Sequence, residues 1–300
     1  MCCKALTTTV SAGIGCGVQE ASYYGYAGML PSKYTRAIML GEAFAGLVVS
    51  LNRIVTKLTI EDPLVNTILF FSLSIVGEIV CIVLHRYIKS SPFIRYYKSR
   101  GLAAITPLHF TPVKPCQGAW ASLKEGLTLR LRVSRKIWKL MLGILNVYFT
   151  TMLLYPGVTS IIQSSWRDGW LPVILITAFN LSDFLGTLTT GLSWKMSENT
   201  LLALGGARWL LIPLLLLSVL PLHAPLLTGE TSPLLVVLML GFTTGYMGST
   251  PMCAAGEQVG ADQRELAGNL MTMMMLIGLT MGSTSALVIN TLLGVGNISH

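Results

Sequence analysis

Apolar runs of about 20 residues recur along this 300-residue chain, and their repetition limits the fold more than any single motif does. A helix needs roughly 20 apolar residues to cross a hydrocarbon core about 30 Å thick. Hydrophobic residues make up 52% of the chain and charged residues only 11%, a composition typical of membrane proteins. We predict an all-α polytopic membrane protein with eight spans, at residues 5–30, 35–58, 63–87, 136–162, 170–192, 200–222, 232–254 and 265–292.

Charge asymmetry predicts the orientation of these spans. Of the 21 Lys and Arg residues, twelve lie between Arg86 and Lys139, a segment whose only acid is Glu125. Cytoplasmic loops carry an excess of Lys and Arg, so we expect this segment on the cytoplasmic side and both chain ends outside. The net charge of +8 then reflects topology and anionic lipid, and we expect a lipid bilayer rather than nucleic acid as the partner.

The basic segment also predicts the domain organisation. Residues 1–88 form a partial N-terminal bundle of three helices, 89–133 a basic cytoplasmic loop, and 134–300 a C-terminal bundle of five helices. From Trp120 onward, leucines alternate with basic residues, which indicates a short amphipathic helix on the inner leaflet before the fourth span. A plain solvated linker is the alternative.

The sequence contains no motif that predicts an enzyme. The four histidines lie in loops or at helix ends, and no nucleophile or phosphate-binding motif accompanies them. The six cysteines have no metal-like spacing. We therefore expect no catalytic residues, no metal and no cofactor. Nothing resembles the repeated rings of a pore, so a carrier of a small-molecule substrate is favoured.

Charged and polar residues inside the spans are the candidate substrate residues. Glu42 lies within span 35–58, where a lipid-facing carboxylate costs roughly 2.5 to 3.5 kcal/mol, so it needs a partner, a cavity or a ligand. Asn180, Asp183 and Thr187 are spaced by three and four residues and share one helical face.

Glu20 in the first span and Arg208 in the sixth complete the candidate set. Glu78 in the third span is also charged, and a position near an interface is its structural alternative. A structural alternative exists for Arg208, which would neutralise Asp183 as a buried ion pair. We expect the remaining members of the set to line one pathway.

Several motifs, in this order along the chain, resemble the equilibrative nucleoside transporter family. They cover nearly the whole chain: Tyr24-Gly-Tyr-Ala-Gly-Met-Leu-Pro31, Gly41-Glu-Ala-Phe-Ala-Gly46, Tyr148 to Gly157, Phe179-Asn-Leu-Ser-Asp-Phe-Leu-Gly186, Arg208 to Pro213, Gly245-Tyr-Met-Gly-Ser249 and Arg264-Glu-Leu-Ala-Gly-Asn269. The acid at Glu42 and the residues 265–272 look most like the plasma membrane monoamine transporter branch.

The resemblance implies a major-facilitator-like bundle of about eleven helices. The first span here looks like the family's fourth, so the chain is expected to be N-terminally truncated. Glu265 resembles an acid that forms an inner gate with an arginine on one of the absent helices. Thr187 departs from the family pattern, which has Arg or Lys at this position to help bind the nucleoside sugar.

The function implied is facilitative transport of small organic cations, such as monoamines, and of nucleosides, by alternating access at the plasma membrane. Two alternatives stay open at this point. One is a nucleoside or adenosine transporter, and the other is a truncated membrane fragment that does not transport. The oligomeric state is not predicted.

Overall fold

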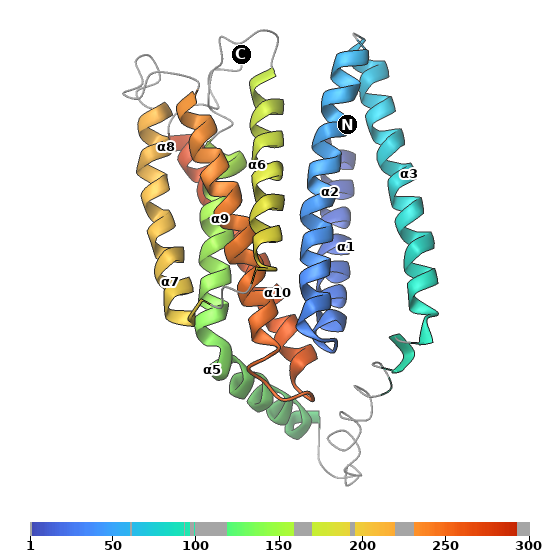
Figure 1. Cartoon of the computed structure of the whole chain (residues 1–300), viewed down its shortest axis with the longest axis vertical. Coiled ribbons are helices and arrows are strands. Elements are labelled where there is room, and N and C mark those ends of the chain that lie inside the picture. Colours follow the sequence, from blue (N-terminus) through green and yellow to red (C-terminus); the bar gives the residue numbers. More distant parts are fainter. Residues whose placement is uncertain are drawn as a thin grey trace.

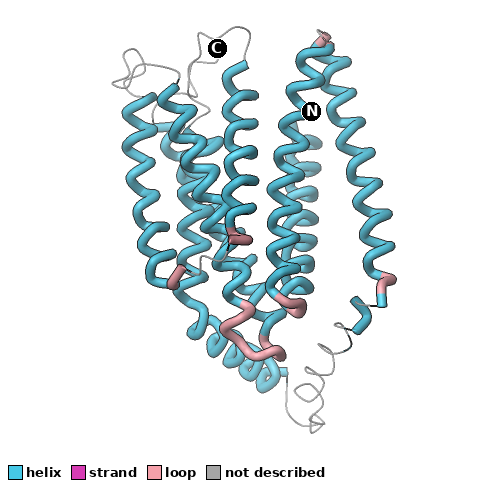
Figure 2. Tube along the Cα trace, viewed as in Figure 1, coloured by secondary structure: helices cyan, strands magenta, loops and turns pink. Residues whose placement is uncertain are grey.

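The computed structural model describes residues 2–60, 62–92, 94–96, 99, 119–158, 170–192, 196–219 and 231–292. Within these ranges the chain is all α-helical, without strands (Figures 1 and 2). The helices are α1 (Cys2–Gly28), α2 (Ser32–Thr59), α3 (Pro63–Lys89), α5 (Ala119–Met152), α6 (Trp170–Thr189), α7 (Glu198–Ala207), α8 (Leu211–Val219), α9 (Thr231–Ala255) and α10 (Arg264–Leu292). A π-helical turn, η1 (Leu153–Val158), follows α5, and a 3-10 turn, η4 (Arg208–Leu210), joins α7 to α8.

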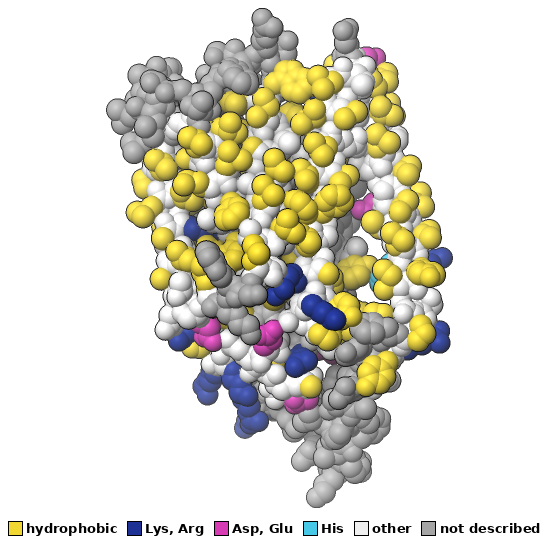
Figure 3. Space-filling view, in the orientation of Figure 1, with side chains coloured by type: hydrophobic (Ala, Val, Ile, Leu, Met, Phe, Trp, Pro, Cys, Tyr) yellow, Lys and Arg dark blue, Asp and Glu magenta, His cyan; other side chains and the backbone are white. Residues whose placement is uncertain are grey.

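Six of the helices in the described ranges are long and apolar enough to cross a membrane: α2, α3, α5, α6, α9 and α10. Apolar side chains cover the middle of the face shown in Figure 3, and Lys and Arg lie mostly in its lower half. The predicted class, an all-α polytopic membrane protein, is confirmed.

The other two predicted spans are helical but do not meet the same criteria. Span 5–30 corresponds to α1, whose 27 residues are rich in Gly, Ser and Thr. Span 200–222 is divided into α7, η4 and α8. Pro213 has no N–H to donate to the carbonyl of Trp209, and the backbone tightens into a 3-10 turn just before it.

The region around the fourth span differs from the prediction. The amphipathic segment is helical, but it continues without a break into the span as the single helix α5, so the predicted boundary at residue 133 lies inside a helix. No proline interrupts residues 119–152. The helix is kinked at Tyr155, which precedes Pro156 and is extended at φ −136° and ψ 124°, and the predicted end of the span at residue 162 lies outside the described residues. Residues 100–118 of the predicted basic loop lie outside the described ranges.

The packing of α2 against α6 joins the N-terminal helices to the C-terminal helices. The helices α1, α2 and α3 lie on one side of the molecule, and the helices from α5 onward form the other (Figure 1). Contacts between the two parts run along α1 with α10 and along α2 with α6. The largest buried cluster lies mainly on α5 and α10, where Ile137, Ile144 and Met271 are fully buried. This core holds α5 in place beside the α2–α6 contact.

Candidate functional site

A cavity of about 160 Å³ lies between α2, α5, α6 and α9. Glu42 from α2 and Asn180, Asp183 and Thr187 from α6 all line it, so four of the six predicted substrate residues meet in one place. Glu42 lies ten residues beyond Ser32, the first residue of α2, which corresponds to about 15 Å along the helix. The cavity is therefore close to the middle of a core about 30 Å thick.

The carboxylate of Glu42 is partly held by a tyrosine of α1. The hydroxyl of Tyr24 donates a hydrogen bond to Oε2 of Glu42, and Tyr24 itself is buried against Met39. An ionised carboxylate only accepts hydrogen bonds, and one donor leaves acceptor capacity unused. Glu42 is exposed to the cavity and pairs with no cation among the described residues. It is therefore available to a positively charged ligand.

The polar face of α6 turns toward α2. The amide Nδ2 of Asn180 donates to Oγ of Ser50 at 2.5 Å, which ties α6 to α2. Asp183, one turn further, is partly buried and has no hydrogen bond within the described part of the chain. Thr187 is only 3% exposed and its hydroxyl lies 3.5 Å from that of Ser249 on α9. Asp183 is thus the second carboxylate that lines the cavity, and unlike Glu42 its side chain has no hydrogen-bond donor among the described residues.

Glycines at the contact of α6 with α9 determine the direction in which the polar face of α6 points. A Cβ on Gly245 of α9 would overlap the carbonyl oxygen of Asp183, and a Cβ on Gly186 of α6 would overlap that of Phe242. The two backbones therefore touch, as small residues at membrane helix contacts allow. This contact fixes the rotation of α6 and directs Asp183 to the cavity.

Arg208 does not form the predicted alternative pair with Asp183. Its side chain is 3% exposed, and Nη2 donates to the hydroxyls of Thr151 and Thr244 at 2.8 Å each. Nη1 donates to the carbonyl oxygen of Val147 at 3.2 Å. Arg208 does not line the cavity, whereas Thr151 and Thr244 do. The guanidinium therefore lies directly behind the cavity wall.

Glu20 and Glu265 also lie away from the cavity lining. Glu20 is partly buried on α1, one turn before Tyr24, and its charge is close enough to act on Glu42. Glu265 is in the first turn of α10, where Gly28 of α1 comes close to the backbone. The gate role of Glu265 stays a prediction.

Residues that sequence reasoning missed complete the wall. Thr151 and Thr244 were not singled out, since hydroxyl residues are common in membrane helices and theirs lie on different helices. Tyr148 lines the cavity and lies within electrostatic range of Glu42 and Asp183. The spacing of three residues puts Tyr148 and Thr151 on one face of α5, but nothing in the sequence indicates that Thr244 of α9 meets them.

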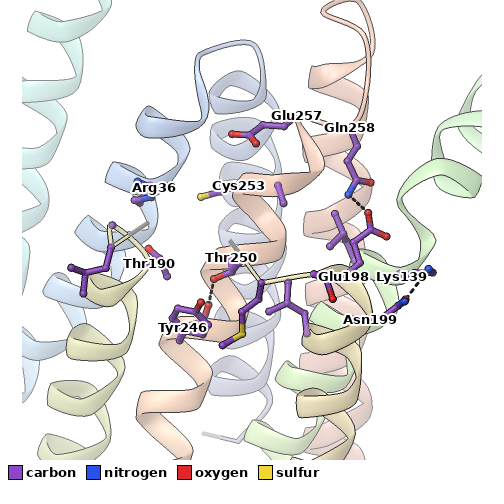
Figure 4. Close-up of a pocket in the computed structure, with 17 residues that line it drawn as sticks. Arg36, Lys139, Thr190, Glu198, Asn199, Tyr246, Thr250, Cys253, Glu257 and Gln258 are labelled. Atoms are coloured by element: carbon purple, nitrogen blue, oxygen red, sulfur yellow. Dashed lines mark hydrogen bonds between the residues drawn. The ribbon is translucent and has the colours of Figure 1, made fainter. Parts of the chain in front are cut away.

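A larger cavity of about 670 Å³ follows toward the end predicted to be cytoplasmic. The two cavities are neighbours along α6, where Thr187 lines the first and Thr190 the second. Figure 4 shows Arg36 and Lys139 on the walls of the larger cavity, with Lys139 bonded to Asn199. Its charged residues are hydrated groups typical of a vestibule rather than of a sealed core.

Contacts between α2 and α6 continue from the cavity toward the opposite end. The rings of Phe44 and Phe184 lie 5.7 Å apart, and beyond the Ser50–Asn180 bond the ammonium of Lys57 lies 4.7 Å from the ring of Trp170. We call this row of contacts the α2–α6 seam. It holds the two parts of the molecule together on the side predicted to be extracellular.

Comparison with known proteins identifies the family. The family model described as nucleoside transporter matches residues 6–291. The chain belongs to the nucleoside transporter family. It is a multi-pass integral membrane protein, and the resemblance inferred from its motifs is confirmed.

Individual relatives agree with this assignment. Equilibrative nucleoside transporter 4 of Danio rerio is 34% identical over an alignment of 331 positions, which covers 95% of this chain and 64% of the relative. The human protein of the same name is also 34% identical, over 94% of this chain and 63% of its own length. Equilibrative nucleoside transporter 2 of Rattus norvegicus is 26% identical over 93% of this chain. The chain spans just under two thirds of the length of the first two relatives.

Proposed function

We propose that this chain carries the central substrate site of a facilitative transporter for small organic cations, such as monoamines, and for nucleosides. The observation that supports the proposal most strongly is the pair of carboxylates, Glu42 from α2 and Asp183 from α6, which line one cavity. Because the two acids come from opposite parts of the molecule, a bound cation bridges them. Membership of a transporter family supports the transport role.

Electrostatics favour a cation in this cavity. An ammonium about 4 Å from one carboxylate gains on the order of 4 kcal/mol at an effective dielectric constant near 20, before desolvation is subtracted. Tyr148 and Phe179 also line the cavity, and their ring faces can add cation–π attraction. Within the described lining there is no Lys or Arg to compete for the acids.

Alternating access agrees with the arrangement of the two cavities and the seam. The vestibule follows the cavity on the predicted cytoplasmic side, while the α2–α6 seam joins the two parts on the other side. On the predicted cytoplasmic side the two parts are also joined, because Oγ of Ser32 donates a hydrogen bond to Oε1 of Glu257 at 2.7 Å and Gly28 lies against the backbone of α10. Alternating access therefore requires these contacts and the seam to open in turn. We place this carrier in the plasma membrane, as expected from the monoamine branch.

A nucleoside or adenosine transporter is the second candidate. The names of the relatives, equilibrative nucleoside transporters, favour it. Asp183 and the hydroxyl of Tyr148 offer an acceptor and a donor to a ribose in the same cavity. A membrane fragment that does not transport is a third candidate, which the uptake measurement below separates from the other two.

A single uptake experiment separates these functions. The purified chain is reconstituted in liposomes, and saturable uptake of radiolabelled tyramine and adenosine is measured, each with an excess of the other as competitor. Tyramine uptake supports the cation carrier, adenosine uptake alone supports the second candidate, and neither supports the fragment. A parallel measurement of tyramine binding in nanodiscs shows whether the site itself is present.

A further inference from the structure

The buried guanidinium of Arg208 has no carboxylate beside it. Its three hydrogen bonds go to two hydroxyls and a backbone carbonyl, and its Nε, although buried, has no hydrogen-bond partner. A buried charge is costly unless an opposite charge compensates it. The compensating charge for Arg208 must therefore act over a longer distance.

That compensation comes from the cavity. Thr151 and Thr244, which accept from Nη2 of Arg208, form part of the cavity wall. The charge of Arg208 acts on Asp183 through this wall, and Asp183 in turn interacts with Glu42. Among the residues that line the cavity or are hydrogen-bonded to its wall by a charged side chain, two carboxylates and one guanidinium give a formal charge of −1. Glu20, which acts on Glu42 from α1, neither lines the cavity nor is bonded to its wall and is outside this count.

The hydroxyls cannot cancel this field by turning their own protons into the cavity. The hydroxyl of Thr151 lies 2.7 Å from the carbonyl oxygen of Val147, that of Thr244 lies 2.7 Å from the carbonyl oxygen of Leu240, and the two hydroxyls lie 3.0 Å from each other. Each proton therefore has an acceptor in a carbonyl or in the other threonine. Each hydroxyl oxygen then accepts from Arg208. Both side chains are thus fixed with their dipoles aligned to the guanidinium.

We propose that Arg208 is a specificity-determining positioning residue that, through Thr151 and Thr244, limits the site to ligands with one positive charge. A monovalent cation neutralises the formal charge of −1, whereas a divalent cation leaves one positive charge in excess in a poorly hydrated cavity. The inference rests on the proposed function, because it assumes that the cavity is the cation site.

The test uses ligands of one shape and different charge. Displacement of radiolabelled tyramine from the chain in nanodiscs is measured with 4-methylbenzylamine, a monocation, and with p-xylylenediamine, a dication with the same ring. We expect the wild-type chain to favour the monocation by about tenfold or more. Arg208→Gln should move the ratio toward the dication by about tenfold, and Arg208→Lys, which keeps the charge, should preserve the ratio.

Comparison of Glu42→Gln with a double variant that restores the formal charge distinguishes an electrostatic role of Arg208 from a purely structural one. Glu42→Gln brings the formal charge to zero and should weaken monocation binding. The double variant Glu42→Gln/Arg208→Gln returns the formal charge to −1 and should recover binding of the monocation. This comparison needs no stable Arg208→Gln single variant. Arg130→Gln, which removes an exposed cation of α5, serves as the matched control and should leave the ratio unchanged.

The outcomes separate this inference from the function on which it rests. If the wild-type chain binds neither tyramine nor the two amines, both the cation site and the role of Arg208 are wrong. If amines bind but the double variant is no better than Glu42→Gln, the site stands and the role of Arg208 in specificity is wrong. An unchanged ratio in a folded Arg208→Gln variant would have the same consequence.

Discussion

At the scale of single residues, the hydrogen-bond partners of each intramembrane charge determine whether it is available to a ligand. Glu42 and Asp183 both face the cavity, but only Glu42 has a hydrogen-bond donor, the hydroxyl of Tyr24. Arg208 is hydrogen-bonded to hydroxyls and a carbonyl instead of an acid. The three charges therefore differ in availability to a ligand although all lie within helices.

Replacement of Glu42 by Gln tests its role in cation recognition. Glu42→Gln keeps the size and an acceptor but removes the charge, so uptake of tyramine should fall by about tenfold or more, equivalent to a loss of about 1.4 kcal/mol. Adenosine uptake should be unaffected or improved, and Glu42→Asp should keep part of the cation transport. Glu78→Gln is the control, since Glu78 is an exposed carboxylate of α3. Unchanged tyramine uptake by Glu42→Gln at normal membrane levels would make Glu42 a packing residue.

Replacement of Asp183 by Asn tests the second carboxylate. The carboxylate of Asp183 has no hydrogen bond in the described part of the chain, so Asp183→Asn leaves no donor unsatisfied, although it removes part of the negative charge that compensates Arg208. We expect uptake of tyramine to fall severalfold while the surface level, measured by biotinylation, stays near normal. A proportional fall of uptake and surface level would instead assign Asp183 a structural role.

At the scale of the elements, the contact of α6 with α9 positions the polar face. The close approach at Gly186 and Gly245 allows one rotation of α6, and a larger residue would force the helices apart. Not every glycine of the membrane helices lies in such a close contact. Gly77 of α3 has no atom within 4 Å of the place that a Cβ would take.

The pair Gly245→Ala and Gly77→Ala measures this difference. Gly245→Ala should destabilise the protein by about 1–3 kcal/mol, because its Cβ would overlap the backbone of α6. Gly77→Ala should be neutral or stabilise by about 0.5–1 kcal/mol, because Ala is the better helix former. Thermal unfolding in detergent, followed by fluorescence-detection size exclusion, gives both values. Equal melting temperatures for the two variants would contradict the close α6–α9 contact.

At the scale of the whole molecule, alternating access requires the α2–α6 seam to open. The cation–π contact of Lys57 with Trp170, at 4.7 Å, lies near the outer ends of the two helices. Arg53 and Asn66, bonded at 2.8 Å, join α2 to α3 on one side of the seam and should move together. The two contacts therefore make a matched pair for a test of motion.

Cross-linking across the seam should stop transport. In a chain whose six cysteines are replaced by Ala, Lys57→Cys/Trp170→Cys is joined with a short bifunctional methanethiosulfonate, and tyramine uptake should be lost and should return on reduction. The same reagent on Arg53→Cys/Asn66→Cys should leave uptake intact, since both residues belong to one moving part. Full uptake across a cross-linked seam would show that the seam does not open.

The sequence alone determined the membrane class, the positions of most helices and four polar residues of the cavity lining, Glu42, Asn180, Asp183 and Thr187. These follow from local physics: the length of apolar runs, the cost of an acid in lipid, and the three-and-four spacing of a helical face. Only the tertiary structure decided that Tyr24 holds Glu42 and that Arg208 lies behind Thr151 and Thr244 rather than beside Asp183. Such contacts depend on the rotation and depth of each helix, which close packing fixes between segments far apart in the chain.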